Sequence, residues 1–212
     1  MFVLQNVSFR YGPATQATPQ GPSNWALHNI SLTLPRGSFH LLTGPSGAGK
    51  TTLFKLLTLA LQPTEGTLTF NTEDLTHATR SQRAHLRRKL GVVYQNFRLL
   101  PHLTVRQNVE LPLTIHGPLT PTQQNEVAEM LEWVGLTSLA EKPAGQLSGG
   151  EQQRTALARA VVHKPEVIIA DEPTGNVDAA MSRKILHLLT ELHKLGTTII
   201  IATHDEKLIN SK

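Results

Sequence analysis

The sequence predicts an α/β fold, and three observations carry that prediction. Residues 44–51 read Gly-Pro-Ser-Gly-Ala-Gly-Lys-Thr, a spacing typical of the loop that surrounds nucleotide phosphates between a strand and a helix. Two segments near the start, residues 3–11 and 26–34, alternate apolar and polar side chains, which predicts antiparallel strands. Later segments are apolar runs of the kind buried in a parallel sheet: residues 91–95, 166–170 and 197–203.

The first elements of the chain frame the glycine-rich loop. Residues 12–23, between the two predicted antiparallel strands, hold three prolines and two glycines, which predicts a long exposed loop. Residues 38–43 are expected to form the strand before the glycine-rich loop, and residues 51–60 the helix after it. This order of strand, loop and helix is the context that the motif requires. Residues 66–71 are expected to form another short strand.

The backbone of the glycine-rich loop is suited to bind phosphate. Its glycines let successive N–H groups turn towards an anion, and the N-terminal end of the following helix adds partial positive charge. Lys50 is expected to reach the β- and γ-phosphates, and the Thr51 hydroxyl to coordinate Mg²⁺. The predicted nucleotide-binding residues of this segment are Gly44, Pro45, Ser46, Gly47, Ala48, Gly49, Lys50, Thr51 and Thr52.

Helix start signals mark two further segments. Thr120, Pro121 and Gln123 combine a cap, a first-turn proline and a capping-box partner, and this helix is expected to run until Gly135. Asp178 precedes a second helix, which Gly196 ends. The apolar stripes of both helices are expected to face the core. Their members are Val127, Met130, Leu131 and Val134 in the first helix, and Ile185, Leu188, Leu189 and Leu192 in the second.

A second motif, Leu-Ser-Gly-Gly-Glu-Gln-Gln-Arg, occupies residues 147–154. Ser148 and Glu151 satisfy the capping-box rule, so a helix is expected to begin here. Glycines in its first turn leave N–H groups uncovered, so the helix start is suited to receive an anion. Taken alone, the motif also fits an ordinary capped helix after a flexible loop. The side chains expected to pack from this helix are Ala156, Leu157, Ala160 and Val161.

Composition limits the class of protein. The chain has 212 residues, a net charge of +4, ten histidines without ligand spacing and no cysteine, which excludes disulfides and thiolate metal sites. No apolar run approaches the roughly 18 residues that span a bilayer, and no signal peptide is visible, so a cytoplasmic protein is expected. Basic residues crowd one segment, where a solvated helical face is favoured over contact with lipid headgroups or nucleic acid. They are Arg80, Arg83, Arg87, Arg88 and Lys89.

The glycine-rich loop and the 147–154 motif together resemble the ATP-binding cassette (ABC) ATPase family, whose signature sequence the second motif is. The resemblance implies that Asp171 orients Mg²⁺ and that Glu172 activates the attacking water, a role that suits a carboxylate beside Mg²⁺ and a γ-phosphate. Gln95 resembles the glutamine that contacts Mg²⁺ and the water, and His204 the histidine that contacts the γ-phosphate. Tyr11 matches the aromatic residue that stacks on adenine.

The family also implies an assembly. Residues 175–178 resemble a loop that crosses to a partner subunit, and the implied state is an ATP-dependent, head-to-tail homodimer. The glycine-rich loop of one subunit would face the signature motif of the other across ATP. The implied catalytic residues are Glu172, His204 and Gln95; the metal ligands are Thr51, Gln95 and Asp171. The ATP-binding residues outside the glycine-rich loop are Tyr11, Ser148, Gly149, Gly150, Glu151 and Asp178.

The implied fold is one domain over residues 1–212. It has a P-loop NTPase core of the RecA-like type, an N-terminal antiparallel β subdomain and an inserted helical subdomain over about residues 97–160. The implied activity is hydrolysis of ATP to ADP and phosphate with Mg²⁺, in which positioning and electrostatics carry the phosphoryl transfer. A GTPase is disfavoured because no Asn-Lys-x-Asp motif occurs.

Two segments of the sequence resemble particular groups within the ABC ATPase family. Residues 170–178 are similar to a group that includes lipoprotein-release ATPases, MacB-type exporters and cell-division ATPases, and residues 90–101 resemble the cell-division (FtsE) type most. This implies an integral membrane partner that is FtsX-like and a peripheral place on the inner face of the cytoplasmic membrane. It also implies cell-wall remodelling without a transported substrate or nucleic acid. A lipoprotein-release or MacB-type subunit is the alternative, because it would share every catalytic residue.

The segment after Gln95 is expected to lie near the surface and to form an apolar patch. In the family, the cleft behind this glutamine receives a short cytoplasmic helix of the membrane partner, and Phe97, Leu99 and Leu100 are suited to contact an amphipathic helix. The alternative is that these side chains pack into the helical subdomain.

Overall fold

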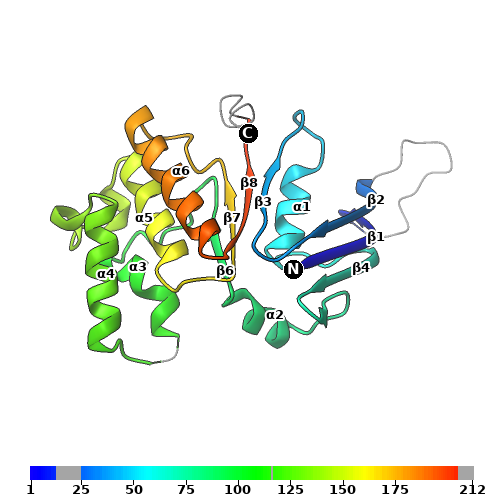
Figure 1. The fold of residues 1–212 in the computed structure, drawn as a ribbon, viewed down its shortest axis with the longest axis horizontal. Helices are drawn as coiled ribbons and strands as arrows, with labels where there is room; N and C mark the ends of the chain where they lie inside the picture. Colours follow the sequence, from blue (N-terminus) through cyan, green and yellow to red (C-terminus); the bar gives the residue numbers. More distant parts are fainter. Residues whose placement is uncertain (13–24, 116, 205–212) are drawn as a thin grey trace.

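The computed structural model describes residues 1–12, 25–115 and 117–204, which form two sheets with helices around them (Figure 1). The antiparallel sheet has the strand order β2-β1-β4-β5 and the parallel sheet has the order β3-β8-β7-β6. The antiparallel strands are β1 Phe2–Arg10, β2 Trp25–Leu34, β4 Glu65–Phe70 and β5 Glu73–Asp74. The parallel strands are β3 Phe39–Leu42, β6 Leu90–Val93, β7 Val167–Asp171 and β8 Thr198–Ala202. Both expected sheets are therefore present.

The helices α4, α5 and α6 begin where the sequence signals place them. Thr120 and Ser148 form complete capping boxes with Gln123 and Glu151, and the Asp178 carboxylate accepts a hydrogen bond from the Met181 N–H at 2.8 Å. None of the helices within the described ranges is long and apolar enough to cross a membrane. The helices are α1 Lys50–Leu57, α2 Arg80–Arg87, α3 Val105–Thr114, α4 Pro121–Trp133, α5 Gly149–Val161 and α6 Ala179–Lys194, with short 3-10 turns at Thr137–Leu139 and Ala144–Gln146.

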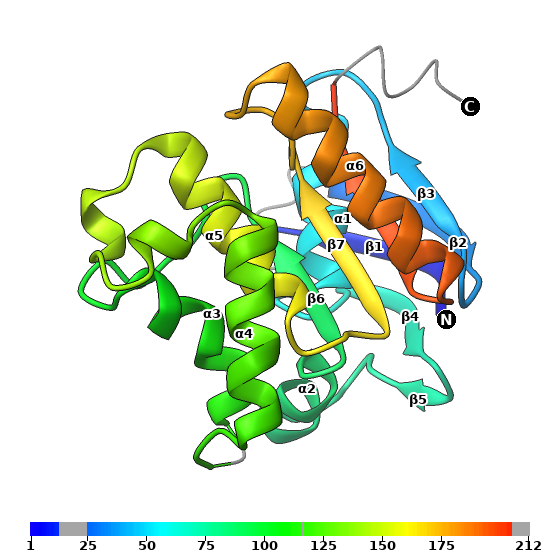
Figure 2. The same cartoon turned by 60° about the vertical axis from the view of Figure 1, so that its left-hand side comes forward.

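The parallel sheet is covered on both faces. On one side, α1 lies between the two sheets, and Phe54 belongs to a buried cluster with Phe2 of β1 and Ile169 of β7. On the other side, α5 and α6 pack against the sheet, where Leu157 and Ile185 share a cluster with Ile199 (Figure 2). Burial on both faces explains why these strands are continuously apolar.

A separate buried cluster joins the helices on the far side of α5. Val109 of α3, Val127 and Leu131 of α4, and Ala158 of α5 belong to it. Leu99 packs against this cluster, as the alternative interpretation of the sequence expects, while Leu100 is exposed. The apolar segment after Gln95 is therefore divided between the core and the surface.

Strand register places the functional edge of the parallel sheet. Leu42 of β3 pairs with Ala202 of β8, Ala202 pairs with Asp171 of β7, and the adjacent Ala170 pairs with Val93 of β6. The carboxyl ends of these strands are therefore level, and ligands of open α/β sheets bind outside such ends. The sequence predicts that Gln95 is the last residue of its strand. In the structure, β6 ends at Val93, so Gln95 lies beyond the end of the strand.

The structure differs from the sequence-based expectation for some helices, and it does not describe most of one predicted loop. The sequence did not indicate α3, because Pro112 lies inside this helix and proline normally predicts a break. Most of the basic segment lies in α2, a helix as expected, but the Arg83 and Arg87 guanidinium groups donate to the carbonyl oxygen of Leu59, just after the end of α1. Of the predicted loop over residues 12–23, all but Gly12 lies outside the described residues.

Candidate active site

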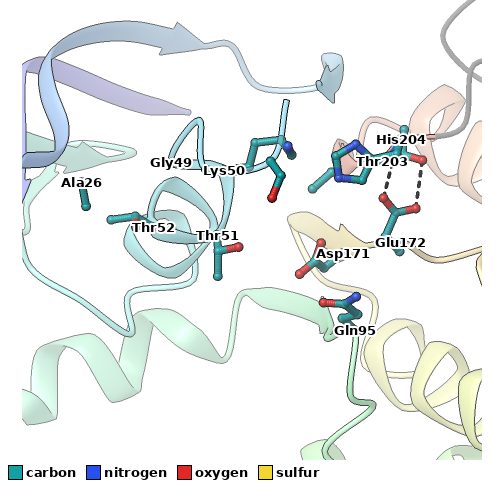
Figure 3. Close-up of a pocket in the computed structure, with 13 residues that line it drawn as sticks. Ala26, Gly49, Lys50, Thr51, Thr52, Gln95, Asp171, Glu172, Thr203 and His204 are labelled. Carbon is teal, nitrogen blue, oxygen red and sulfur yellow. Dashed lines mark hydrogen bonds between the residues drawn. The ribbon is translucent and has the colours of Figure 1, made fainter. Parts of the chain in front are cut away.

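A cavity of about 300 Å³ opens at the carboxyl ends of the parallel strands, next to the start of α1 (Figure 3). It brings the glycine-rich loop together with residues that follow β6, β7 and β8. The lining residues are Ala26, Ser46, Gly47, Gly49, Lys50, Thr51, Thr52, Gln95, Asp171, Glu172, Ala202, Thr203 and His204. All of the predicted catalytic residues and metal ligands thus share one pocket with part of the glycine-rich loop.

The last glycine of the glycine-rich loop lies in close contact with β2. Gly49 has a φ of 89°, and a Cβ atom at this position would lie 2.6 Å from the Ala26 carbonyl oxygen, so only glycine fits. The Lys50 ammonium donates to the carbonyl oxygens of Gly44 at 2.5 Å and Pro45 at 2.9 Å, which holds its charge against the loop. The loop therefore presents a positive charge and the N-terminus of α1 to the pocket.

Three oxygen-bearing side chains lie opposite the loop. Figure 3 shows Thr51, Gln95 and Asp171 directed towards the same part of the pocket, and all three line it. Burial raises the pKa of Asp171, and the neighbouring Glu172 carboxylate raises it further, whereas His204 and Lys50 lower it. Negative charge is thus costly at this point, and a cation would relieve the cost.

Glu172 is fixed by the end of β8. One carboxylate oxygen accepts from the His204 backbone N–H at 2.8 Å and the other accepts from the Thr203 hydroxyl at 3.2 Å (Figure 3). Its own N–H donates to the Ala202 carbonyl oxygen at 2.9 Å, and its φ of 50° is rare for a residue other than glycine. The carboxylate is consequently held in one place within the pocket.

Several predicted site residues do not line this pocket. Tyr11 is exposed at its edge, with its hydroxyl 3.3 Å from the Thr52 hydroxyl. Gly44, Pro45 and Ala48 belong to the loop but not to the lining. The signature residues Ser148, Gly149, Gly150 and Glu151 form the start of α5, and Asp178 forms the cap of α6, so one chain does not bring them to the pocket.

Sequence reasoning missed two kinds of residue in the pocket. Ala26 lies on β2, far from any motif, and only the fold brings it to the loop. Thr203 stands next to His204, and its position at the end of a buried strand is a signal that could have identified it.

The fold and the pocket together define a P-loop nucleotide hydrolase. Residues 27–175 match the model of the ABC transporter family. The chain belongs to this family, as one of its ATP-binding and ATP-hydrolysing cassettes.

Known proteins similar to the chain agree with this class. The cell division ATP-binding protein FtsE of Haemophilus influenzae is 43% identical, with 100% of this chain and 94% of that protein aligned. FtsE of Bacillus subtilis is 42% identical, with 92% of this chain and 85% of that protein aligned. Among solved structures, the ATP-binding cassette MJ0796, a dimer in a post-hydrolysis state bound to ADP and phosphate, has a TM-score of 0.89 at 34% identity, covering 98% of this chain and 90% of that one.

Proposed function

We propose that this chain is the ATPase subunit of a membrane complex that acts in cell division, on the inner face of the cytoplasmic membrane with an FtsX-like integral partner. The observation that carries the proposal is the single pocket in which the glycine-rich loop faces Asp171, Glu172 and His204. The similarity to FtsE over nearly the whole chain supports the cellular role. Residues 1–212 would act as one domain, with the helical subdomain over about residues 97–160.

The roles of the pocket residues follow from their chemistry. Lys50 and the α1 N-terminus bind the β- and γ-phosphates of ATP. Glu172, held from both oxygens, polarises the attacking water, and His204 contacts the γ-phosphate from the neighbouring strand end. Gln95 orients the same water. Because phosphoryl transfer depends mainly on positioning and charge, a fixed carboxylate is more useful here than a mobile one.

Thr51, Gln95 and Asp171 would hold Mg²⁺. Their hydroxyl, amide and carboxylate oxygens are ligands that this ion accepts, and it binds with one or two carboxylates plus substrate phosphates. The raised pKa of Asp171 fits the same assignment, because a cation favours the ionised form. When bound, Mg²⁺ neutralises charge on the transferred phosphoryl group.

The residues outside the pocket are assigned to a head-to-tail homodimer. In it, Ser148, Gly149, Gly150 and Glu151 at the start of α5 face the ATP of the partner subunit, with Asp178 nearby. The α5 N-terminus offers uncovered N–H groups to an anion. The dimeric state of MJ0796 supports this arrangement. Tyr11, exposed beside Thr52, would stack on adenine.

A second cavity suits the membrane partner. An apolar groove of about 380 Å³ lies between β6, α3 and α5, and Leu111, Pro112 and Ile115 line one side of it. Burial lowers the pKa of His163 in this groove, and the Arg159 guanidinium is engaged with the carbonyl oxygens of Phe97 at 2.6 Å and Arg98 at 2.8 Å. The groove is therefore suited to the apolar face of a short cytoplasmic helix. Through Arg159, its occupant would act on the segment that carries Gln95.

The function is tested on the purified chain with ATP and Mg²⁺. Lys50→Ala removes the cation that binds the β- and γ-phosphates, so calorimetry should show loss of tight ATP binding and ATPase activity should disappear. Lys184→Ala, on the exposed face of α6, is the matched control and should bind and hydrolyse ATP normally. ATP binding of wild-type strength by Lys50→Ala would show that this loop is not the nucleotide site.

A further inference from the structure

We propose that Gln153 is a positioning residue of the ATPase reaction, which holds Glu172 and the loop of residues 175–178 from the second turn of α5. The inference rests on the proposed role of Glu172 in hydrolysis. It adds a residue that does not line the pocket and that lies behind it, in the helix that begins with the signature motif.

The contacts of Gln153 use both ends of its amide. The side chain is 1% exposed; its Nε2 donates to the Glu172 carbonyl oxygen at 3.1 Å, and its Oε1 accepts from the Asn176 N–H at 2.9 Å. Because a carbonyl can only accept and a backbone N–H can only donate, these partners fix the orientation of the amide. One buried side chain thus joins both sides of the turn that follows β7.

Glu172 needs such support because of its backbone. A φ of 50° is costly outside glycine and persists only where surrounding contacts impose it. The Glu172 N–H is tied to Ala202, and its carbonyl oxygen accepts from Gln153 and from the Gly175 N–H at 3.1 Å. The two residues that follow β8 therefore fix the carboxylate, while α5 fixes the peptide that carries it.

The first turn of α5 approaches the same loop. A Cβ atom on Gly150 would lie 3.1 Å from the Asn176 carbonyl oxygen and 3.9 Å from Val177, so glycine permits this close packing. In the proposed dimer, the start of α5 faces the ATP of the partner subunit. Gln153 then connects that surface to the Glu172 of its own chain, and a shift of α5 would move the general base.

The experiment compares two buried polar side chains of α5. Gln153→Met keeps the length of the side chain and removes both hydrogen bonds. Thr155→Val is the matched control, because Thr155 is 0% exposed and donates to the Glu151 carbonyl oxygen at 2.8 Å, away from Glu172. We expect kcat of Gln153→Met to fall by about tenfold or more, while KM for ATP stays within about twofold of wild type. Thr155→Val should lower the melting temperature with little change in kcat.

The possible outcomes distinguish the positioning role of Gln153 from the proposed ATPase function. If wild-type protein hydrolyses ATP and Gln153→Met retains the kcat of Thr155→Val, the positioning role is wrong and the ATPase assignment stands. If the wild-type protein does not hydrolyse ATP, the proposed function itself fails. Should Gln153→Met not fold, Gln153→Asn provides the same test, because its amide is one methylene too short to reach both partners. A wild-type kcat in Gln153→Asn would also overturn the proposal.

Discussion

The charge of the Asp171 carboxylate suits the proposed binding of Mg²⁺, but it lowers the stability of the folded chain. Its carboxylate ends a buried strand beside a second carboxylate, and burial raises its pKa above the ordinary value of 3.8. The folded protein thus holds this proton more tightly than the unfolded chain does. By linkage, the free energy of unfolding falls as pH rises from the ordinary value through the raised pKa.

Asp171→Asn should remove this cost. In buffer without nucleotide or metal at neutral pH, the variant should melt at a higher temperature than wild type, by at most about 4 °C because the site is partly open to solvent. The difference should disappear below the ordinary pKa of the carboxyl group, and ATPase activity should be lost at every pH. Calorimetric melting of both proteins across pH tests this. A lower melting temperature for Asp171→Asn would show that the carboxylate stabilises the fold.

Individual site residues can be predicted from the sequence where a motif requires a particular residue type. Lys50, Thr51, Gln95, Asp171, Glu172 and His204 could all be proposed from motifs, and the structure brings them to one pocket. The role of Gln153 could not be proposed in this way. Its partners are backbone groups of Glu172 and Asn176, and sequence patterns do not reveal backbone hydrogen bonds across a fold.

Helices and strands follow local signals where those signals are complete. Thr120 accepts from the Gln123 N–H at 3.3 Å, and the Gln123 side chain accepts from the Thr120 N–H at 2.9 Å, so the capping box satisfies two of the orphan donors at the start of α4. The helix α3 also begins with a capping box, between Thr104 and Gln107. The sequence nevertheless does not predict this helix, because Pro112 lies inside it. Tertiary packing on α5 and the buried side chain of Asn108, which donates to the Leu100 carbonyl oxygen at 3.0 Å, sustain this helix.

The cap of α4 can be tested in isolation from the chemistry. Thr120→Ala removes the acceptor for the Gln123 N–H and should lower the free energy of unfolding by about 1 kcal/mol without changing kcat. Thr122→Ala, in the first turn of the same helix, is the control and should have a smaller effect. Urea denaturation of the two variants compares them. An equal loss of stability in both would mean that the capping box does not stabilise α4.

The whole molecule is organised so that one chain supplies two separate surfaces. The pocket lies at the carboxyl ends of the parallel strands, whereas the signature residues begin α5 outside it. Continuous apolar runs predict the parallel sheet well, because strands that are buried on both faces are apolar along their length. They do not reveal the apolar groove between β6, α3 and α5, since it depends on how helices from distant parts of the chain meet.

Recruitment by a membrane partner should depend on this groove. Ile115 is 55% exposed at its rim, so Ile115→Ser should weaken binding to membranes that carry the integral partner, while soluble ATPase activity is retained. Leu195→Ser is the matched control, because Leu195 is 83% exposed and does not line the groove. Cosedimentation with native membranes measures recruitment. Equal binding by both variants would exclude the groove, and recovery of a lipoprotein-extracting complex would replace the cell-division role.

In the proposed function, ATP joins two copies of this chain and Glu172 then promotes hydrolysis. Glu172→Gln should bind ATP with Mg²⁺ as wild type does, while turnover slows by about a hundredfold or more. The trapped complex should accumulate as a dimer. The most direct measurement is size-exclusion chromatography with light scattering of Glu172→Gln, with and without ATP. We expect Glu172→Gln to have twice the mass of one chain with ATP and the mass of a single chain without it. A variant that binds ATP by calorimetry yet stays monomeric, or that hydrolyses ATP at the wild-type rate, would contradict it.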